Sequence, residues 1–170
     1  MKPPVSMIGK QGFIISGAVA RPLSVGTVHI TSSDPKKDPA IDPAYMTHPA
    51  DVEILAKSIE LCEKMAATSP LKEKIKKRYW PLENVDLTTQ KGRKDFVKGN
   101  HGTQYHPLGT VSMGPEGKGA CDKRLNVRGV RGVRVVDASV IPLHVSGNIV
   151  STVYALAEKA SDLIKEDWKL

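Results

Sequence analysis

The sequence predicts an α+β fold, and two patterns carry this prediction. Residues 12–20 are rich in β-branched and small side chains and residues 25–31 alternate in polarity, which predicts two neighbouring strands. Apolar residues recur at helical spacing over 49–67 and again from about Asn148 onward, which predicts two long helices. A chain of 170 residues has the length of one domain, so we expect residues 1–170 to form a single domain.

The N-terminal elements follow in order along the chain. The two strands are expected to pair through the connection 21–24, and the prolines and turn formers of 32–43 predict a loop. Pro49 suits the first turn of the next helix, and an acidic side chain at Asp51 suits the positive end of its dipole. The expected buried face of this helix comprises Val52, Leu55, Ile59, Cys62 and Met65. Shorter helices are expected over 70–78 and 88–97.

The C-terminal third predicts a strand, a turn and a helix in close succession. The strand covers 133–136 and ends at Asp137, and Ser146 or Asn148 is expected to cap the helix that follows. The start of a helix offers free backbone amides, which suit anions or polar rings. The expected inner stripe of this helix comprises Ile149, Val153, Leu156, Ala157, Ala160 and Ile164.

Charge and composition exclude several classes of protein. The net charge of +7 comes largely from 70–80 and 123–134, but no nucleic-acid-binding motif accompanies these runs, so we expect no nucleic-acid partner. No stretch approaches the length of a membrane span, and the N-terminus lacks the apolar core of a signal peptide. Two cysteines are too few for a disulfide framework. We therefore expect a soluble, cytoplasmic protein without a membrane partner.

Three blocks of sequence together indicate a family. "YHPLGTVSMG", "LNVRGVRGVRVVDASVIP" and "GNIVSTVYALAEKASDLI" resemble, in this order, the C-terminal signature of the glucose–methanol–choline (GMC) flavin oxidoreductases. The earlier segment 20–61 resembles part of the family's substrate domain, so the similarity covers roughly residues 13–165. The resemblance implies a mixed or antiparallel sheet with helices packed on one side. It also implies a substrate-domain-like segment over 12–98 and a catalytic segment over 99–170.

The resemblance also implies roles for individual residues. His106 matches the catalytic histidine that handles the proton of the substrate hydroxyl, and Asn148 matches the second catalytic position. Asp137 and Ala138 match the turn that meets the FAD diphosphate and ribityl chain, and Ile149 matches the helix start beside the flavin. If FAD binds, its contacts in this chain would therefore comprise Asp137, Ala138, Asn148 and Ile149.

Further residues are candidates for the lining of the pocket. Tyr105 precedes His106 directly, His101 lies five residues before it, and His144 lies in the turn after Pro142. Ser146 and Ile149 flank the second catalytic position. No pair of histidines has the ligand spacing and neighbouring carboxylates of a metal site, so we expect no metal.

The sequence departs from the family in one respect, since no G-x-G-x-x-G follows a strand to hold the ADP half of FAD. One hypothesis is a truncated GMC-like protein that acts without a cofactor as a non-redox acid/base catalyst. It would be a cyclase, isomerase, dehydratase or pericyclase acting on an apolar small molecule in natural-product biosynthesis. The alternative is an FAD-dependent alcohol oxidase or dehydrogenase that needs a missing FAD-binding half, because no side chain accepts a hydride. The third is a non-catalytic ligand-binding remnant.

Unpaired strand edges and exposed apolar surface favour rearranged packing or a homodimer that completes the sheet.

Overall fold

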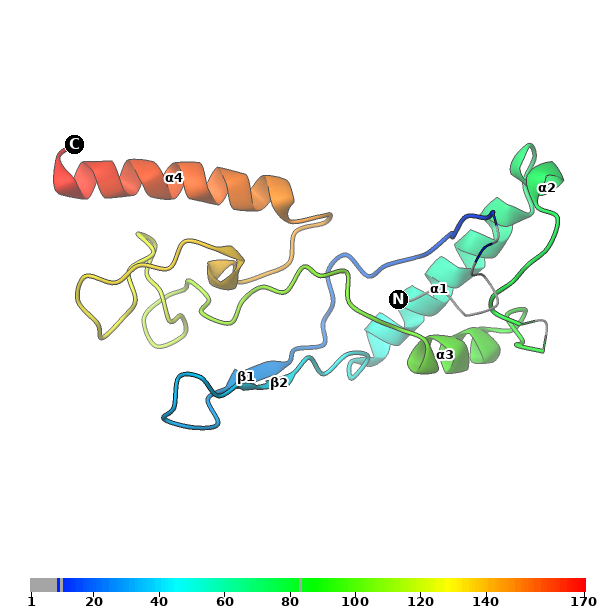
Figure 1. The fold of residues 1–170 in the computed structure, drawn as a ribbon, viewed down its shortest axis with the longest axis horizontal. Coiled ribbons are helices and arrows are strands. Elements are labelled where there is room, and N and C mark those ends of the chain that lie inside the picture. Colours follow the sequence, from blue (N-terminus) through cyan, green and yellow to red (C-terminus); the bar gives the residue numbers. More distant parts are fainter. Residues whose placement is uncertain (1–8, 10, 83) are drawn as a thin grey trace. The chain divides into compact units, whose positions relative to one another are not determined.

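The structure, a computed structural model of the chain, describes residues 9, 11–82 and 84–170. Figure 1 shows its helices and strands. The chain divides into two compact units. Unit 1 comprises residues up to Gly26 together with Pro43–Gln104, and unit 2 comprises Thr27–Asp42 together with Tyr105–Leu170. Compactness does not test independent folding, so the single domain stays a prediction.

Unit 1 contains three helices, α1 (Pro49–Ala66), α2 (Leu71–Lys74) and α3 (Gln90–Gly99). They confirm the helices expected over 49–67, 70–78 and 88–97, although α2 is shorter than expected. His48 caps α1, since its ring Nδ1 accepts a hydrogen bond from Ala50 N at 3.2 Å. The first turn of α1 thus has a side-chain acceptor for one of its free amides.

The core of unit 1 lies between α1 and α3. Val52 and Ala56 of α1 pack with Phe96 and Val97 of α3, and Leu87 closes the cluster. The rings of Trp80 and Phe96 are tilted, with centroids 5.1 Å apart. Two residues of the expected buried face of α1 lie further out: Met65 is 49% exposed and Cys62 is half-buried. The core therefore forms at the N-terminal half of α1, where α3 covers it.

Gly92 in α3 is required by a close approach of the chain. A Cβ at this position would lie 2.0 Å from the carbonyl oxygen of Asp86, which is backbone and cannot turn aside. We expect Gly92→Ala to lower the melting temperature, although Gly→Ala within a helix ordinarily adds about 1 kcal/mol of stability. The control is Gly99→Ala in the same helix, where a Cβ meets nothing within 4 Å. Equal melting temperatures for the two variants would contradict the packing described.

The predicted strand over 12–20 does not form, which corrects the sequence interpretation. This segment is irregular and belongs to the same compact unit as α1. Gly17 approaches α1 so closely that a Cβ there would meet the Ser58 side chain. A little further on, the amides of Leu23 and Ser24 donate to the carboxylate of Asp51. These contacts hold the segment against a helix. A helix offers no strand edge with which the segment could form the hydrogen bonds of a sheet.

The predicted strand 25–31 pairs with a segment that follows it in the sequence, and not with residues 12–20, which precede it. β1 (Thr27–His29) pairs with β2 (Ala40–Asp42) in an antiparallel ribbon with Val28 opposite Ile41. β2 lies within the stretch 32–43 that was expected to be entirely loop, so that prediction was wrong at its end. Side-chain turns at Ser32 and Asp34 reverse the chain between the strands.

The strand predicted over 133–136 is reduced to a single bridge in unit 2, between Asn126 and Arg134. Leu125, Gly129 and Gly132 all have positive φ values, so the chain before this segment turns repeatedly. The core of unit 2 instead comprises Cys121, Leu125, Val140 and Ala160. Cys121 is fully buried here.

The helix α4 (Val150–Trp168) confirms the predicted C-terminal helix. Its N-cap is Ile149, and no side chain caps it, so the expected capping by Ser146 or Asn148 is wrong. Ile149, Ala160 and Leu163 are buried, whereas Ala157 and Ile164 of the predicted stripe are exposed. The buried face keeps helical spacing, but it passes through Leu163 in place of Ile164.

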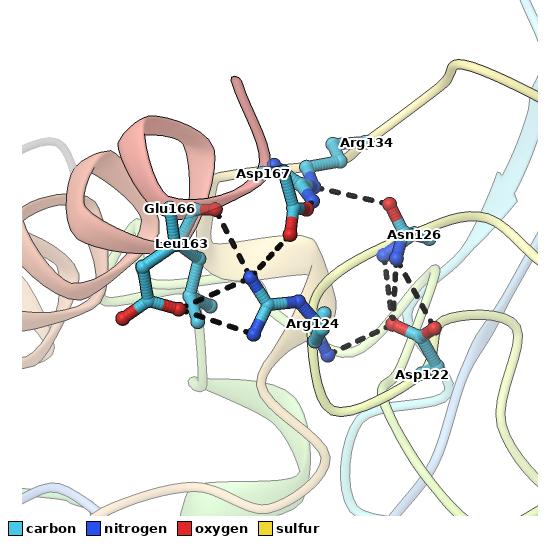
Figure 2. A network of polar contacts seen from close by, with 7 residues as sticks. All are labelled: Asp122, Arg124, Asn126, Arg134, Leu163, Glu166 and Asp167. Carbon is cyan, nitrogen blue, oxygen red and sulfur yellow. Dashed lines mark hydrogen bonds and ion pairs between the residues drawn. The ribbon is translucent and has the colours of Figure 1, made fainter. Parts of the chain in front are cut away.

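A polar network fastens the C-terminal end of α4 to the loops of unit 2 (Figure 2). Arg124 donates to Glu166 at 3.2 Å, to Asp167 at 2.6 Å and to the carbonyl of Leu163 at 3.1 Å. Arg134 also donates to Asp167, and this hydrogen bond, with Arg124 beside it, lowers the pKa of the Asp167 carboxyl. The carboxylate of Asp122 holds the loop itself, since it accepts from the amides of Arg124 and Asn126.

Loss of this network is expected to loosen the last turns of α4. Arg124→Gln removes the contacts to both acidic side chains, so we expect amide hydrogen exchange in 163–168 to become a few-fold faster. Exchange measured by NMR or mass spectrometry checks this. Arg131→Gln is the matched control, because Arg131 is an exposed arginine of the same loop region. The two variants exchanging alike would show that Arg124 does not fasten the helix.

Helices together with a small antiparallel sheet confirm the predicted α+β class. The sheet has two strands in the described part of the chain. The packing of helices on one side of a larger sheet and the homodimer stay predictions. None of the helices that the structure describes is both long and apolar enough to span a membrane.

Candidate functional site

The loop that carries His106 is fixed against the segment after Asp137. The amides of Gly109, Val111 and Met113 donate to the carbonyls of Ala138, Ser139 and Val140 at 3.3, 3.0 and 2.8 Å. Alternate residues of one segment thus pair with successive residues of the other. The imidazole of His106 is half-buried and makes no hydrogen bond with the side chains or backbone that the structure describes.

The backbone on either side of His106 has unusual conformations. Tyr105 has a φ of +60°, rare for a tyrosine, and its side chain is 78% exposed. Gly109 has a φ of +85°, which a glycine adopts without strain. Ser112 then donates its hydroxyl to the carbonyl of Gly109 at 2.6 Å. The backbone therefore turns on both sides of His106.

Asp137 holds the turn that follows. Its carboxylate accepts from the amide of Ser139 at 2.8 Å and so caps the 3-10 helix η2 (Ala138–Val140). The hydrogen bonds with Ser139 lower the pKa of the Asp137 carboxyl, so this group is ionised at neutral pH. Ala138 is half-buried, and its carbonyl accepts the hydrogen bond from the amide of Gly109.

The start of α4 is open. Ser146 and Asn148 are exposed, whereas Ile149 is only 6% exposed and anchors the first turn. Gly147 has a φ of +155°, and a Cβ there would meet nothing within 4 Å. Since no side chain caps the helix, the first amides of α4 are available to a ligand.

The sequence predicted His144 only as a residue of the pocket lining, whereas the structure gives it a direct contact with the loop of His106. Its ring Nε2 lies 3.1 Å from the carbonyl oxygen of His106, and it therefore links the loop of His106 to the segment that leads to Asn148. His101, in contrast, belongs to unit 1. There its Nδ1 lies 3.1 Å from the carbonyl of Val97, and its ring meets Tyr45 edge-on. The structure thus groups Tyr105, His106, Asp137, Ala138, His144, Ser146, Asn148 and Ile149 in unit 2, without His101.

Two cavities in the described structure lie in unit 1. One, of about 560 Å³, is lined by charged residues that include Glu60, Arg78 and Arg93, and the other lies between α1 and α2. No candidate residue lines either of them. In the part of the chain that the structure covers, no group of three or more histidine, cysteine or acidic side chains could hold a metal ion.

Unit 2 thus presents a histidine loop, an aspartate turn and an uncapped helix start on one scaffold. The profile of the GMC oxidoreductase family matches residues 22–157, and the chain belongs to this family.

Individual relatives agree with this assignment. A dehydrogenase of Monascus ruber, citC, is 41% identical over 165 residues, which cover 97% of this chain and 26% of the relative. Versicolorin B synthase of Aspergillus parasiticus is 33% identical over 153 residues, covering 89% of this chain and 24% of the relative. A formate oxidase of Aspergillus oryzae, a variant studied for modification of its FAD, matches with a TM-score of 0.79 at 29% identity. That match covers 89% of this chain and 26% of the oxidase.

The chain therefore spans about a quarter of the length of the curated relatives it matches. It corresponds to the C-terminal part of GMC oxidoreductases, as the sequence predicted.

Proposed function

We propose that this chain supplies the proton-handling residues of an FAD-dependent alcohol-oxidising site, with His106 as general base and Asn148 as hydrogen-bond donor. The observation that carries the proposal is the convergence of their segments in unit 2. The rungs between 109–113 and 138–140 fix the loop of His106, and His144 joins it to the segment before Asn148. Family membership supplies the reaction class.

The roles follow from the chemistry of the two side chains. The imidazole of His106 accepts the proton of the substrate hydroxyl while the C–H bond on the carbon that bears this hydroxyl breaks. The amide of Asn148 donates a hydrogen bond to the substrate oxygen, on which negative charge develops. FAD, when bound, supplies the acceptor for the hydride.

The residues of this chain fit one part of FAD. The uncapped start of α4 and the open space beside Gly147 can receive a polar ring edge that accepts hydrogen bonds. The amide of Ser139 donates to the Asp137 carboxylate, and the amides of Val140 and Ile141 donate to carbonyls within the turn. The amide of Ala138 is therefore the group of this turn that would meet a diphosphate. The remaining contacts would come from a polypeptide segment outside these 170 residues.

Exposure of the site favours this proposal over catalysis by the chain alone. Besides Asn148, the neighbouring Leu143 is 79% exposed and Val150 55% exposed. Sites for small apolar molecules are enclosed and bury most of the ligand. A second polypeptide segment that covers these side chains would provide such an enclosure.

A chimera tests the proposal. It joins the part of the Monascus ruber dehydrogenase that this chain does not cover to the 170 residues of this chain. We expect the purified chimera to be yellow, and a panel of primary and benzylic alcohols to bleach its flavin absorbance without oxygen. The product should be lighter than the substrate by two hydrogens. A yellow chimera that none of the alcohols bleaches would contradict the redox function.

A second candidate is supported by the similarity to versicolorin B synthase. In this alternative the same two residues act without FAD as a non-redox acid/base pair, of cyclase, isomerase, dehydratase or pericyclase type, on an apolar small molecule. The chain would then enclose its substrate as a homodimer. A product with the mass of the substrate, or lighter by one water, formed by the colourless chain, would favour this candidate.

A further inference from the structure

His144 contacts the loop of the proposed general base through one hydrogen bond. Its Nε2 lies 3.1 Å from the backbone carbonyl oxygen of His106, 38 residues earlier in the chain. A carbonyl oxygen only accepts hydrogen bonds, so Nε2 carries the hydrogen and donates it. The contact therefore fixes the tautomer of neutral His144 with its proton on Nε2.

The second ring nitrogen of His144 has no hydrogen-bond partner among the residues that the structure describes. Nδ1 is buried and makes no hydrogen bond with the described part of the chain. Among the described residues, the hydrogen bond to the carbonyl of His106 is thus the polar contact that holds this ring. Its position depends on this contact, and in turn it restricts the peptide group of His106.

The backbone hydrogen bonds that pair residues 109–113 with 138–140 begin only at Gly109. The contact with His144 therefore restrains the peptide group of His106 ahead of them. The first rung is the amide of Gly109, at 3.3 Å from its acceptor. Between the left-handed Tyr105 and this rung, the His144 contact is a side-chain hydrogen bond that fixes the backbone. The chain also turns just after His144, where the amide of Gly147 donates to Val145 at 2.9 Å. This turn leads directly to Asn148.

We propose that His144 is a positioning residue: by donating from Nε2 to the carbonyl of His106, it fixes the imidazole of His106 relative to the segment carrying Asn148. This proposal rests on the proposed function for the catalytic meaning of that position. Misplacement of a reacting group by about 1 Å can cost on the order of 100-fold in rate. His144 itself does not touch the substrate.

The test uses the 170-residue chain with isotopically labelled histidine and long-range NMR of the imidazole nitrogens. We expect His144 to show the Nε2-protonated tautomer. In His144→Phe, which keeps the ring shape but removes the donor, the ring and amide signals of His106 should shift and broaden. His144→Gln places an amide donor near the position of Nε2 and should restore them.

The matched control is His101→Phe. The ring of His101 also lies 3.1 Å from a carbonyl, but it belongs to unit 1, so its loss should leave the His106 signals unchanged. If His144→Phe folds with unchanged His106 signals, or if His144→Gln does not restore them, the positioning role is overturned. If His144→Phe does not fold, the tautomer of the native chain decides, and a proton on Nδ1 overturns the proposal.

These outcomes are separate from those of the proposed function, because the NMR readout needs neither FAD nor a substrate. In the chimera, we expect His144→Phe to lower kcat on the order of tenfold with little change in KM, and His144→Gln to recover most of it.

Discussion

Replacing His106 by alanine is expected to lower the rate of alcohol-dependent flavin reduction in the chimera about 100- to 10,000-fold. This range is typical of removing a general base that is positioned in the active site. The imidazole is half-buried and makes no hydrogen bond within the described residues, so its loss should hardly change the melting temperature. Rapid-mixing measurement of flavin absorbance, with thermal melting in parallel, checks both expectations.

The control for this prediction is His29→Ala. His29 lies in β1 of the same unit and is exposed, and neither resemblance nor contact assigns it to the site. Its variant should reduce flavin at the native rate. A His106→Ala chimera that keeps more than about a tenth of the native rate would show that another group takes the hydroxyl proton.

Replacing Asp51 by alanine is expected to cause a large loss of stability. The side chain is fully buried. Its carboxylate accepts from the amide of Leu23 at 2.9 Å, and from the amide and hydroxyl of Ser24 at 2.7 and 2.5 Å. Removing it leaves the partly buried amides and hydroxyl of residues 23–24 without their acceptor, so the free energy of unfolding should fall by about 3 kcal/mol. Denaturant unfolding measures this loss.

Asp95→Ala is the matched control in unit 1. Asp95 is an exposed aspartate whose partner is Lys91, one helical turn earlier. Exposed ion pairs contribute little, so this variant should lose less than about 1 kcal/mol. Comparable losses for the two variants would contradict the anchoring of residues 23–24 by Asp51.

The pH dependence of the Asp51 contribution has a definite sign. Burial by itself would raise the pKa of this carboxyl, but the hydrogen bonds from Ser24 and Leu23 outweigh it and hold the pKa below its ordinary 3.8. A lowered folded-state pKa stabilises the fold above the unfolded value, and the contribution is lost as the pH falls through the folded value. The stability difference between the native chain and Asp51→Asn should thus be constant above about pH 5 and shrink below it. A difference that grows on acidification would contradict this sign.

The helices could be predicted because their signals are local. Pro49 and Asp51 mark the start of α1, and the apolar spacing marks its buried face. The strands could not, because a ladder needs a partner that lies elsewhere. Residues 12–20 have strand-like composition, yet the contacts of Gly17 and Leu23 bind this segment to α1. The pairing of β1 with β2 likewise depended on turns within 32–43.

The candidate site was predicted only through the order of its motifs. That order located His106, Asp137 and Asn148, and the structure places all three in unit 2. The contact of His144 with the carbonyl of His106 has no sequence signal, since it depends on how two loops meet. The capping prediction failed for a related reason. Ile149 takes a helical conformation and anchors α4 by burial, which leaves Asn148 exposed outside the helix.

The central claim is that His106 and Asn148 complete a flavin site. The rest of this site is provided by a polypeptide segment outside these 170 residues. Anaerobic titration of the chimera with alcohols, followed by flavin absorbance, tests it most directly. We predict full bleaching in the native chimera and almost none when His106 and Asn148 are both alanine, with bleaching compared per bound FAD. Equal bleaching in the two proteins would contradict the account.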